Sequence, residues 1–569
     1  MAEGQRGVDR RTFLAAAVGA VAAACSSSSS DKTAPTTTGP SGPSGPTTAT
    51  IGPTTTPAST TTSAPATTAA SPSTLAPVLS ATSPTNGFAA NPFALGVASG
   101  DPTSSAVILW THVTTGSSLA DKPDWTVAWD VAHDEQFTRL AASGTAATLP
   151  AAATTVHVDA GGLAPDTWYF YRFRSDAFAS TVGRTRTLPA ADAAPTGLRF
   201  GFASCQDWQG GYYAAHRDVA ASKLDLVVWL GDYIYEYGPD PAAVRPHTGG
   251  VCATYADYAA RYALYRSDPD LQAAHASCPW LVIWDDHEVE NNYADATSEK
   301  AGTDPGAFRA RRAQAYQAWW DFTPTRLARP TGPDLKIYRD LTFGRLAHVF
   351  LLDGRQYRSN QACGAADQGI NLAPPCEEWS QPDRTMLGAD QERWLLDGIG
   401  ASTATWNVVG NQVVLSDARL NGVVLNYDQW DGYPVARQRL VQGIAATGKT
   451  NVVVVTGDIH LAAVADVTPG TIDTGPVPAG GAAPVATELV GTSISSGALL
   501  PAAVEEQVSQ FPALHYLNVR NRGWVLNEVT ATEWRATYRV VADVTNADSA
   551  VTTDASFVVV PTTPGATRV

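Results

Sequence analysis

The sequence predicts two folded domains of different classes: an all-β sandwich followed by a larger α/β domain. Over residues 88–190, short strand-like runs such as "AVILWTHV" and "DTWYFYRF" are separated by turn residues, which is typical of an immunoglobulin- or fibronectin-like sandwich. Over residues 195–560, Val-rich runs alternate with helical stretches, which favours an α/β sandwich with a mixed sheet. With 569 residues, of which 44% are hydrophobic and 16% charged, the chain has the composition of a globular protein.

The first 25 residues have the features of an export signal. Arg10 and Arg11 precede an apolar run of small residues that ends at Cys25 and is short for a membrane span. Paired arginines followed by Phe-Leu are typical of twin-arginine (Tat) signals. The segment "AVAAAC" also resembles a lipoprotein cleavage site, although Ala22 stands where Leu or Val is usual. We therefore expect an extracellular or cell-surface protein, either secreted or anchored through a lipid on Cys25.

Residues 26–85 consist of Ser, Thr, Pro, Ala and Gly with almost no charged or bulky apolar side chains. Such a segment cannot bury enough surface to offset the entropy lost on ordering, so we expect a disordered linker. The whole chain carries a net charge of −16. This charge argues against a nucleic-acid partner, because phosphate backbones select basic surfaces.

Six cysteines raise the question of which ones pair outside the cytoplasm. If Cys25 carries a lipid, five remain, and one of them must be free. Cys363 and Cys376 lie in one loop-like segment and could pair, as could Cys252 and Cys278. Cys205 is left over at the end of an apolar strand, where it could serve as a ligand.

Polar residues follow four of the predicted strands in the α/β domain. They occur in "FASCQ", "LGDYIY", "WDDHEVENN" and "TGDIH". Each group alone is ambiguous, since an Asp can stabilise a turn and "DDH" can cap the next helix. Ligand sites in α/β sheets form at the carboxyl ends of strands, and four such ends together favour a shared metal site.

The residue types indicate which metals would bind. Thiolate and phenolate ligands favour a highly charged ion such as Fe³⁺, whereas carboxylate and amide oxygens favour Ca²⁺, Mg²⁺ or Mn²⁺. Asp232 could bridge two ions, and Tyr235, three residues further on, would reach the same ion. Two metal ions close together suit in-line displacement at phosphorus, because one can bind a phosphate oxygen while the other activates water.

The chain from about residue 88 to 560 resembles the PhoD-like alkaline phosphatase family of the metallophosphoesterases. The resemblance rests on "FASCQ", "GDYIYE", "WDDHEVENN", "LLDGRQYR", "GNQ" and "TGDIH", in this order. The Tat signal, the N-terminal sandwich and the C-terminal tail match as well. The resemblance implies an αββα catalytic domain, one Fe³⁺ with one or more Ca²⁺, and hydrolysis of phosphate esters by a metal-activated hydroxide.

The resemblance also implies a set of metal ligands. Cys205, Asp232 and Tyr235 would bind iron. His460 and Asp458 of "GDIH" would complete the cluster on the iron and calcium sides. Asn292 would bind calcium. Asp286 would be either a ligand or a support for one. The expected ligands are Cys205, Asp232, Tyr235, Asp286, Asn292, Asp458 and His460.

Three residues are expected to act in catalysis. In the resemblance, His287 would contact phosphate, and either His287 or His460 would assist proton transfer. Arg355 could bind phosphate through two hydrogen bonds. The family motif around this arginine more usually reads Asp-Thr-Arg, and Gly354 occupies the middle position here. A structural salt bridge from Arg355 to Asp353 or Asp285 is an equal alternative.

These features predict an exported phosphatase and phosphodiesterase that acts as a monomer on small phosphate esters and scavenges phosphate outside the cell. A phospholipase D of the same family is the nearest alternative and would need an apolar approach to the metals. The aromatic run "QAYQAWWDF" could supply it, although core packing is its more usual role. A non-catalytic adhesion protein, using the sandwich, is an alternative of a different class.

Overall fold

The computed structural model describes residues 78–569 except 115–123, 150–152, 365–373, 420–422, 471, 473–481 and 511–512. The predicted signal, Cys25 and the linker as far as residue 77 lie outside the described residues. None of the helices in the described ranges is long and apolar enough to span a bilayer.

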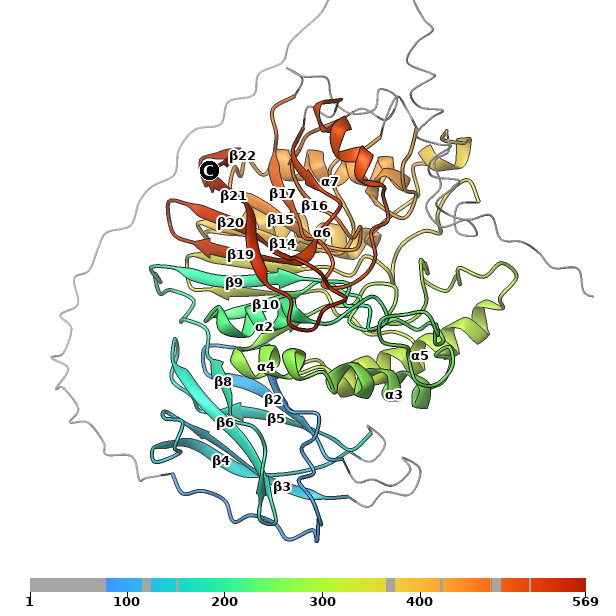
Figure 1. Cartoon of the computed structure of the whole chain (residues 1–569). Coiled ribbons are helices and arrows are strands. Elements are labelled where there is room, and N and C mark those ends of the chain that lie inside the picture. The colour runs from blue at the N-terminus through green and yellow to red at the C-terminus, as the bar shows by residue number, and fades with distance from the viewer. Residues whose placement is uncertain are drawn as a thin grey trace, which may run out of the picture. The chain divides into compact units, whose positions relative to one another are not determined.

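The larger sheet of the described chain has ten strands in the order β22-β21-β20-β19-β9-β10-β11-β1-β2-β5 (Figure 1). Its centre is formed by β9, β10 and β11, which run parallel to one another. The strands are β1 (Val97–Gly100), β2 (Ala106–His112), β5 (Thr155–Gly161), β9 (Leu198–Ala203), β10 (Leu226–Trp229), β11 (Trp280–Val282), β19 (Arg522–Val529), β20 (Trp534–Val541), β21 (Val551–Val560) and β22 (Thr563–Arg568).

A second sheet, of seven strands in the described ranges, has the order β12-β13-β14-β15-β17-β16-β18. Its parallel part is formed by β13, β14, β15 and β17. From the strand runs alone we predicted a mixed sheet; the structure divides these strands between two sheets. The strands are β12 (Arg339–Phe343), β13 (Ala347–Leu351), β14 (Trp406–Asn411), β15 (Val452–Thr456), β16 (Ala462–Val467), β17 (Ala486–Val490) and β18 (Leu514–Asn518).

The two sheets share a core, and helices lie on their outer sides (Figure 1). In β15, Val453 packs in the cluster that contains Phe200 of β9, whereas its neighbour Val454 packs with residues of α6 and α7. Because neighbouring strand residues point to opposite faces, this alternation places β15 between the core and the helices. The helices are α2 (Ala214–Ala221), α3 (Tyr255–Arg266), α4 (Pro269–Ser277), α5 (Pro305–Phe322), α6 (Gly388–Ala401) and α7 (Pro434–Ala446), with 3₁₀ helices η4 (Glu377–Ser380), η5 (Trp430–Gly432) and η6 (Ala502–Gln510).

The predicted β-sandwich is present, but its first sheet continues the larger sheet of the α/β domain. Gly100 of β1 pairs in parallel with Trp280 of β11, and β2 and β5 follow beyond it. The added strands give the backbone groups of β11 hydrogen-bond partners that an exposed edge would lack. The opposing sheet of the sandwich has the order β4-β3-β6-β7, with β8 paired to β6. Its strands are β3 (Thr126–Ala132), β4 (Leu140–Ala147), β6 (Trp168–Ser175), β7 (Phe178–Ala179) and β8 (Gly183–Arg186).

Asp101 holds the junction between the sandwich and the α/β domain, and replacing it should destabilise the protein. Its buried carboxylate pairs with Arg339 at 2.7 Å and accepts a hydrogen bond from the Thr325 hydroxyl at 2.8 Å. We expect Asp101→Ala to lower the free energy of unfolding by about 2–4 kcal/mol, because partners are left unpaired in a buried place. Asp159→Ala removes a more exposed ion pair, to Arg326, and should cost at most about 1 kcal/mol. The measurement is thermal unfolding of both variants. Equal losses of stability in Asp101→Ala and Asp159→Ala would contradict the role of Asp101 at the junction.

Candidate metal centre

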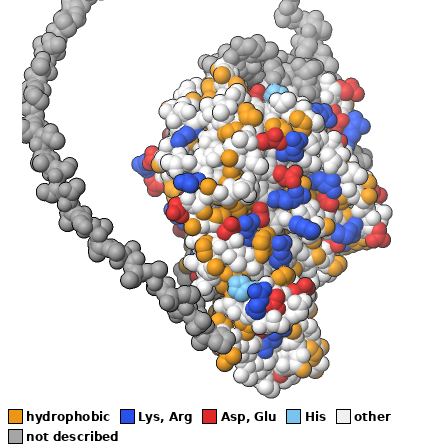
Figure 2. Space-filling model, turned by 90° about the vertical axis from the view of Figure 1, so that its left-hand side faces the viewer, with side chains coloured by type: hydrophobic (Ala, Val, Ile, Leu, Met, Phe, Trp, Pro, Cys, Tyr) orange, Lys and Arg blue, Asp and Glu red, His pale blue; other side chains and the backbone are white. Residues whose placement is uncertain are grey.

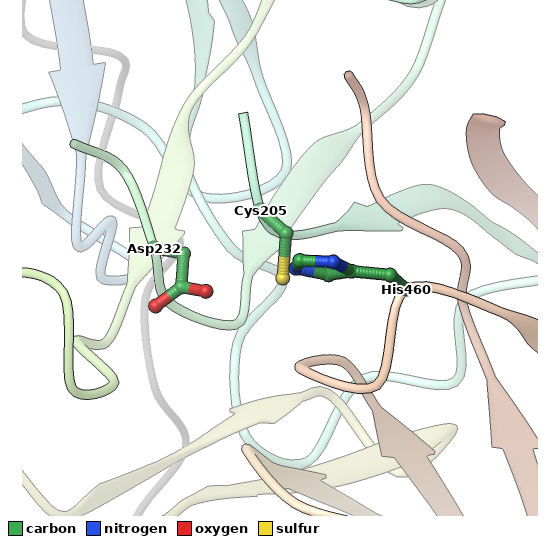
Figure 3. A group of neighbouring side chains, drawn as sticks. All are labelled: Cys205, Asp232 and His460. Carbon is green, nitrogen blue, oxygen red and sulfur yellow. The ribbon is translucent and has the colours of Figure 1, made fainter. Parts of the chain in front are cut away.

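Side chains from the ends of strands in both sheets meet at one place. Cys205 follows β9 and Asp232 follows β10 in the larger sheet, whereas His460 follows β15 in the second sheet. Figure 3 shows the thiol, the carboxylate and the imidazole facing a common space. One ligand atom from each lies within 4.8 Å of the others. The predicted convergence of strand ends is therefore confirmed for these three residues.

Five of the predicted ligands have left-handed backbone conformations, which non-glycine residues seldom adopt. Each such residue costs free energy and persists only where its surroundings fix it, as commonly happens at functional sites. The φ angles are 60° at Cys205, 55° at Asp232, 53° at Asn292, 62° at Asp458 and 55° at His460.

Glu288 joins the loops that follow β10 and β11. Its fully buried carboxylate accepts hydrogen bonds from the backbone N–H groups of Asp232 at 3.1 Å, Tyr233 at 2.7 Å and Asp285 at 2.9 Å. Burial raises the pKa of Glu288 to about 7. The loops also touch at Gly231, whose φ is 113° and where a Cβ atom would lie 2.4 Å from the Cβ atom of Asp285. Sequence reasoning missed Glu288, although it lies inside "DDHEVENN".

Tyr235 joins the same group of ligands. Its hydroxyl lies 3.0 Å from Asp232 Oδ2 and 3.1 Å from His460 Nε2. The other nitrogen of the imidazole, Nδ1, lies 2.8 Å from the carbonyl oxygen of Gly497, which can only accept a hydrogen bond. Burial lowers the pKa of His460 to about 3, so the ring is neutral. The proton therefore resides on Nδ1, and the Nε2 lone pair faces the group of ligands.

Cys205 is free and buried, as the cysteine count predicted. Burial raises the pKa of its thiol well above the ordinary value, and the carboxylates of Asp232 and Asp458 raise it further. Without a cation the side chain is a neutral thiol. A bound cation would favour the thiolate, which is the form that binds metals.

Of the two disulfide pairings suggested from the sequence, one is confirmed and the other is wrong. Cys363 and Cys376 form a disulfide, as expected. The pairing suggested for Cys252 and Cys278 is wrong, since both are free and buried. Cys252 lies before α3, where its backbone N–H donates to the carbonyl oxygen of Glu236, and Cys278 lies after α4. Both side chains pack in the same large hydrophobic cluster without forming a bond to each other.

A second, oxygen-only group adjoins the first. Carboxylate oxygens of Asp285, Asp286 and Asp458 lie within 4.8 Å of one another, and Asp232 and Asp286 form a third group with His287. Asp285 Oδ2 is buried without a hydrogen-bond partner in the described part of the chain. An orphaned carboxylate oxygen among other carboxylates fits a hard cation such as Ca²⁺. The sulfur, phenol and imidazole donors beside it form a set of different chemistry.

Arg355 lies fully buried among the carboxylates. It pairs with Asp285, with Asp428 at 2.8 Å and with Asp458 at 3.4 Å. Of the two salt bridges considered from the sequence, the one to Asp285 forms. The guanidinium of Arg355 does not pair with Asp353, whose carboxylate accepts the backbone N–H of Arg355 instead. Sequence reasoning missed Asp428, because this residue follows no strand of the described sheets.

His287 forms an ion pair with Glu236 beside Tyr235, and its backbone N–H donates to Asp286. His287 Nδ1 lies 2.7 Å from a carboxylate oxygen of Glu236, and the ring centroids of His287 and Tyr235 are 4.0 Å apart. Burial would lower the pKa of His287, but Asp286, Tyr237 and Glu236 outweigh it and raise this pKa well above the ordinary value. Asp286 Oδ2 accepts the backbone N–H of Asn292 at 2.7 Å, which places Asn292 next to the oxygen-only group.

Comparison with known proteins gives one consistent answer. Residues 200–538 match the family model "PhoD-like phosphatase", and residues 79–189 match its N-terminal domain. The chain is 42% identical to alkaline phosphatase D of Bacillus subtilis (strain 168) over 487 residues, which cover 83% of this chain and 81% of the relative. A solved structure titled "Structure of PhoD" aligns with a TM-score of 0.79 and 42% identity, covering 85% of this chain and 93% of that one.

The buried carboxyl of Asp458 should make the metal-free protein sensitive to pH. Burial raises its pKa to about 6, so the folded chain keeps a proton that the unfolded chain has already released. Its contribution to stability is therefore present at about pH 4 and lost as the pH rises through about 6. Histidines with lowered pKa values, such as His460, have the opposite effect, because they stabilise the folded chain more as the pH rises. The effect of Asp458 must therefore be isolated by comparing the wild type with an Asp458 variant.

We expect Asp458→Asn to gain about 2 kcal/mol of stability relative to the wild type between about pH 4 and 7, because the amide cannot ionise. The measurement is chemical unfolding of both chelator-treated proteins across this range. Added Ca²⁺ should reverse the order by stabilising the wild type more. A constant difference across the pH range would contradict the buried ionisation.

Proposed function

The chain belongs to the PhoD-like phosphatase family of phosphoric ester hydrolases, and we propose that the residues at the strand ends form its catalytic centre. One Fe³⁺ and one or more Ca²⁺ would bind there. The αββα architecture of metallophosphoesterases belongs to this proposal. The helices outside the two packed sheets agree with it.

One observation carries the proposal: two sets of donors with different chemistry are linked through Asp232 and Asp286. On one side lie Cys205 and His460, with the Tyr235 hydroxyl 3.0 Å from Asp232. On the other side, Asp286 links Asp232 to the oxygen-only group. The first set would hold Fe³⁺, and the second, with Asn292 and Asp458, would hold Ca²⁺. Bound there, the cations would neutralise phosphoryl oxygens and activate water for in-line attack.

His287 is the residue best placed to contact the phosphoryl group. Glu236 holds its Nδ1, which leaves Nε2 of the protonated ring as a donor. A positively charged donor is well suited to oxygens on which negative charge develops in the transition state. The same proton could pass to the leaving alcohol. We assign His460 to ligation rather than proton transfer, because its Nε2 faces Tyr235 and Asp232.

We assign Arg355 first to orienting carboxylates. Its guanidinium is completely buried and holds Asp285 and Asp458, both members of the oxygen-only group. A direct hydrogen bond from Arg355 to phosphate would require one of these carboxylates to turn towards a cation. We propose this contact with phosphate as a second role for Arg355.

We also propose that the protein is exported through the Tat pathway and acts as a monomer at or outside the cell surface, where it scavenges phosphate. A lipid on Cys25 would anchor it to the membrane. Small phosphate esters are the proposed substrates. On the face shown in Figure 2, acidic and basic side chains are interspersed. Such a surface does not favour a nucleic-acid partner.

The phospholipase alternative has less support. The aromatic side chains of α5 do not provide an apolar approach, because Trp319 is fully buried and Trp320 is 8% exposed. Near the centre, Tyr237 is 42% exposed and lies edge-on to His287 with 5.2 Å between ring centroids. An exposed aromatic ring beside His287 suits the organic part of a small ester.

The proposal is tested by measuring the leaving group released from each of three substrates: phosphate and phenol from an aryl monoester, phenol from an aryl diester, and choline from a phosphatidylcholine vesicle. We expect hydrolysis of the two small esters, loss of activity with a chelator, and recovery when metals are restored. Asp232→Asn should lower kcat/KM by more than the roughly 100-fold that removal of an outer-shell partner costs. Asp304→Asn, the same change at the N-cap of α5, should keep full activity. Cleavage of the vesicle lipid alone would favour the phospholipase alternative. Full activity in Asp232→Asn would contradict the proposal that the residues at the strand ends form the catalytic centre.

A further inference from the structure

Residues 492–497, with the sequence "TSISSG", lie directly against the loop that carries Cys205. They follow β17, a fifth strand that ends near the centre. The backbone N–H of Ile494 donates to the carbonyl oxygen of Ser204 at 3.0 Å, and that of Ser496 donates to the carbonyl oxygen of Cys205 at 3.3 Å. The Ser495 hydroxyl donates to the carbonyl oxygen of Asp207 at 2.7 Å. This segment is therefore bound along the whole Cys205 loop.

The segment also contacts three of the four proposed iron ligands. The buried hydroxyl of Ser496 lies 2.8 Å from the carbonyl oxygen of Cys205 and 2.8 Å from the hydroxyl of Tyr235. The next residue, Gly497, accepts the Nδ1 proton of His460 at 2.8 Å. One short segment thus touches a thiol-bearing loop, a phenol and an imidazole.

A count of protons shows what the Ser496 hydroxyl does. It has one proton to donate, and its oxygen already accepts the backbone N–H of Asp207 at 3.2 Å. While Tyr235 is a phenol, its own proton can go to Asp232. Once Tyr235 binds a cation as phenolate, its oxygen is a charged acceptor and forms a stronger hydrogen bond than the neutral carbonyl of Cys205. The Ser496 proton then belongs to the phenolate.

The position of Ser496 is fixed independently of the ligands. Its carbonyl oxygen accepts hydrogen bonds from the Ser493 hydroxyl at 2.7 Å and from Arg522 Nη1 at 2.9 Å. Arg522 is itself buried and also donates to the carbonyl oxygen of Val519. A donor held in this way needs no rearrangement when the metal binds.

We propose that Ser496 is a positioning residue that donates a hydrogen bond to the phenolate of Tyr235 and so tunes and retains the iron. The inference rests on the proposed Fe³⁺ centre. Outer-shell partners of this kind orient ligands and adjust their donor strength. Without the hydrogen bond, the phenolate would be a less stabilised electron donor, so its charge-transfer absorption to Fe³⁺ should move to longer wavelength.

The test compares Ser496→Ala with Ser495→Ala in the iron-loaded, full-length protein. Both changes remove one buried hydroxyl, but the Ser495 hydroxyl binds only the carbonyl of Asp207. We expect Ser496→Ala to shift the absorption band and to lose iron to a chelator about 10-fold faster. Ser495→Ala should keep the wild-type band and rate within about twofold, and Ser496→Thr, which retains a hydroxyl, should restore both.

Equal bands and equal rates of iron loss in Ser496→Ala and Ser495→Ala would overturn the role of Ser496 and leave the iron centre intact. A wild-type protein that hydrolyses esters but contains no iron would overturn both the iron assignment and this inference, while the phosphatase activity stands. Thermal unfolding of each variant separates these results from a general loss of folding.

Discussion

The structure is organised around buried negative charge at the meeting point of two sheets. An unpaired buried carboxylate costs several kcal/mol, and the carboxylates here outnumber the fixed cations around them. Metal cations would supply the missing positive charge, which is why a donor set of this kind indicates metal binding. The buried carboxylates are Asp232, Asp285, Asp286, Asp428, Glu236 and Glu288, joined by Asp458, whose side chain is 13% exposed; the arginines beside them are Arg355 and Arg358.

The rest of the fold keeps these charges in place. Parallel strands of both sheets end at the same point, and the loops that follow turn sharply enough to need left-handed backbone at Cys205 and Asp232. Buried acceptors and donors such as Glu288 and Ser496 hold those loops. The continuation of the larger sheet into the sandwich adds partners to β11, whose end leads to Asp285 and Asp286.

The sequence predicts most of the centre because its ligands directly follow apolar strands, as Asp232 and His460 do. It does not predict Glu288, Asp428 or Ser496 as partners, because their roles depend on how loops distant in the chain meet. The same limit explains the incorrect Cys252–Cys278 pair and the division of the strands between two sheets, which the strand runs alone do not show. Hydrophobic periodicity shows that strands exist, but the order in which they pair is set by tertiary packing.

Whether iron binds at Tyr235 can be decided from the metal content and visible spectrum of the purified full-length protein and of its Tyr235→Phe variant. We expect one Fe³⁺ with bound Ca²⁺, and a phenolate-to-iron absorption band in the wild type that disappears in Tyr235→Phe. A colourless wild-type protein that contains only zinc or magnesium would contradict this expectation. Tyr235 and Cys205 would then be packing residues, and the phosphatase would use other metals.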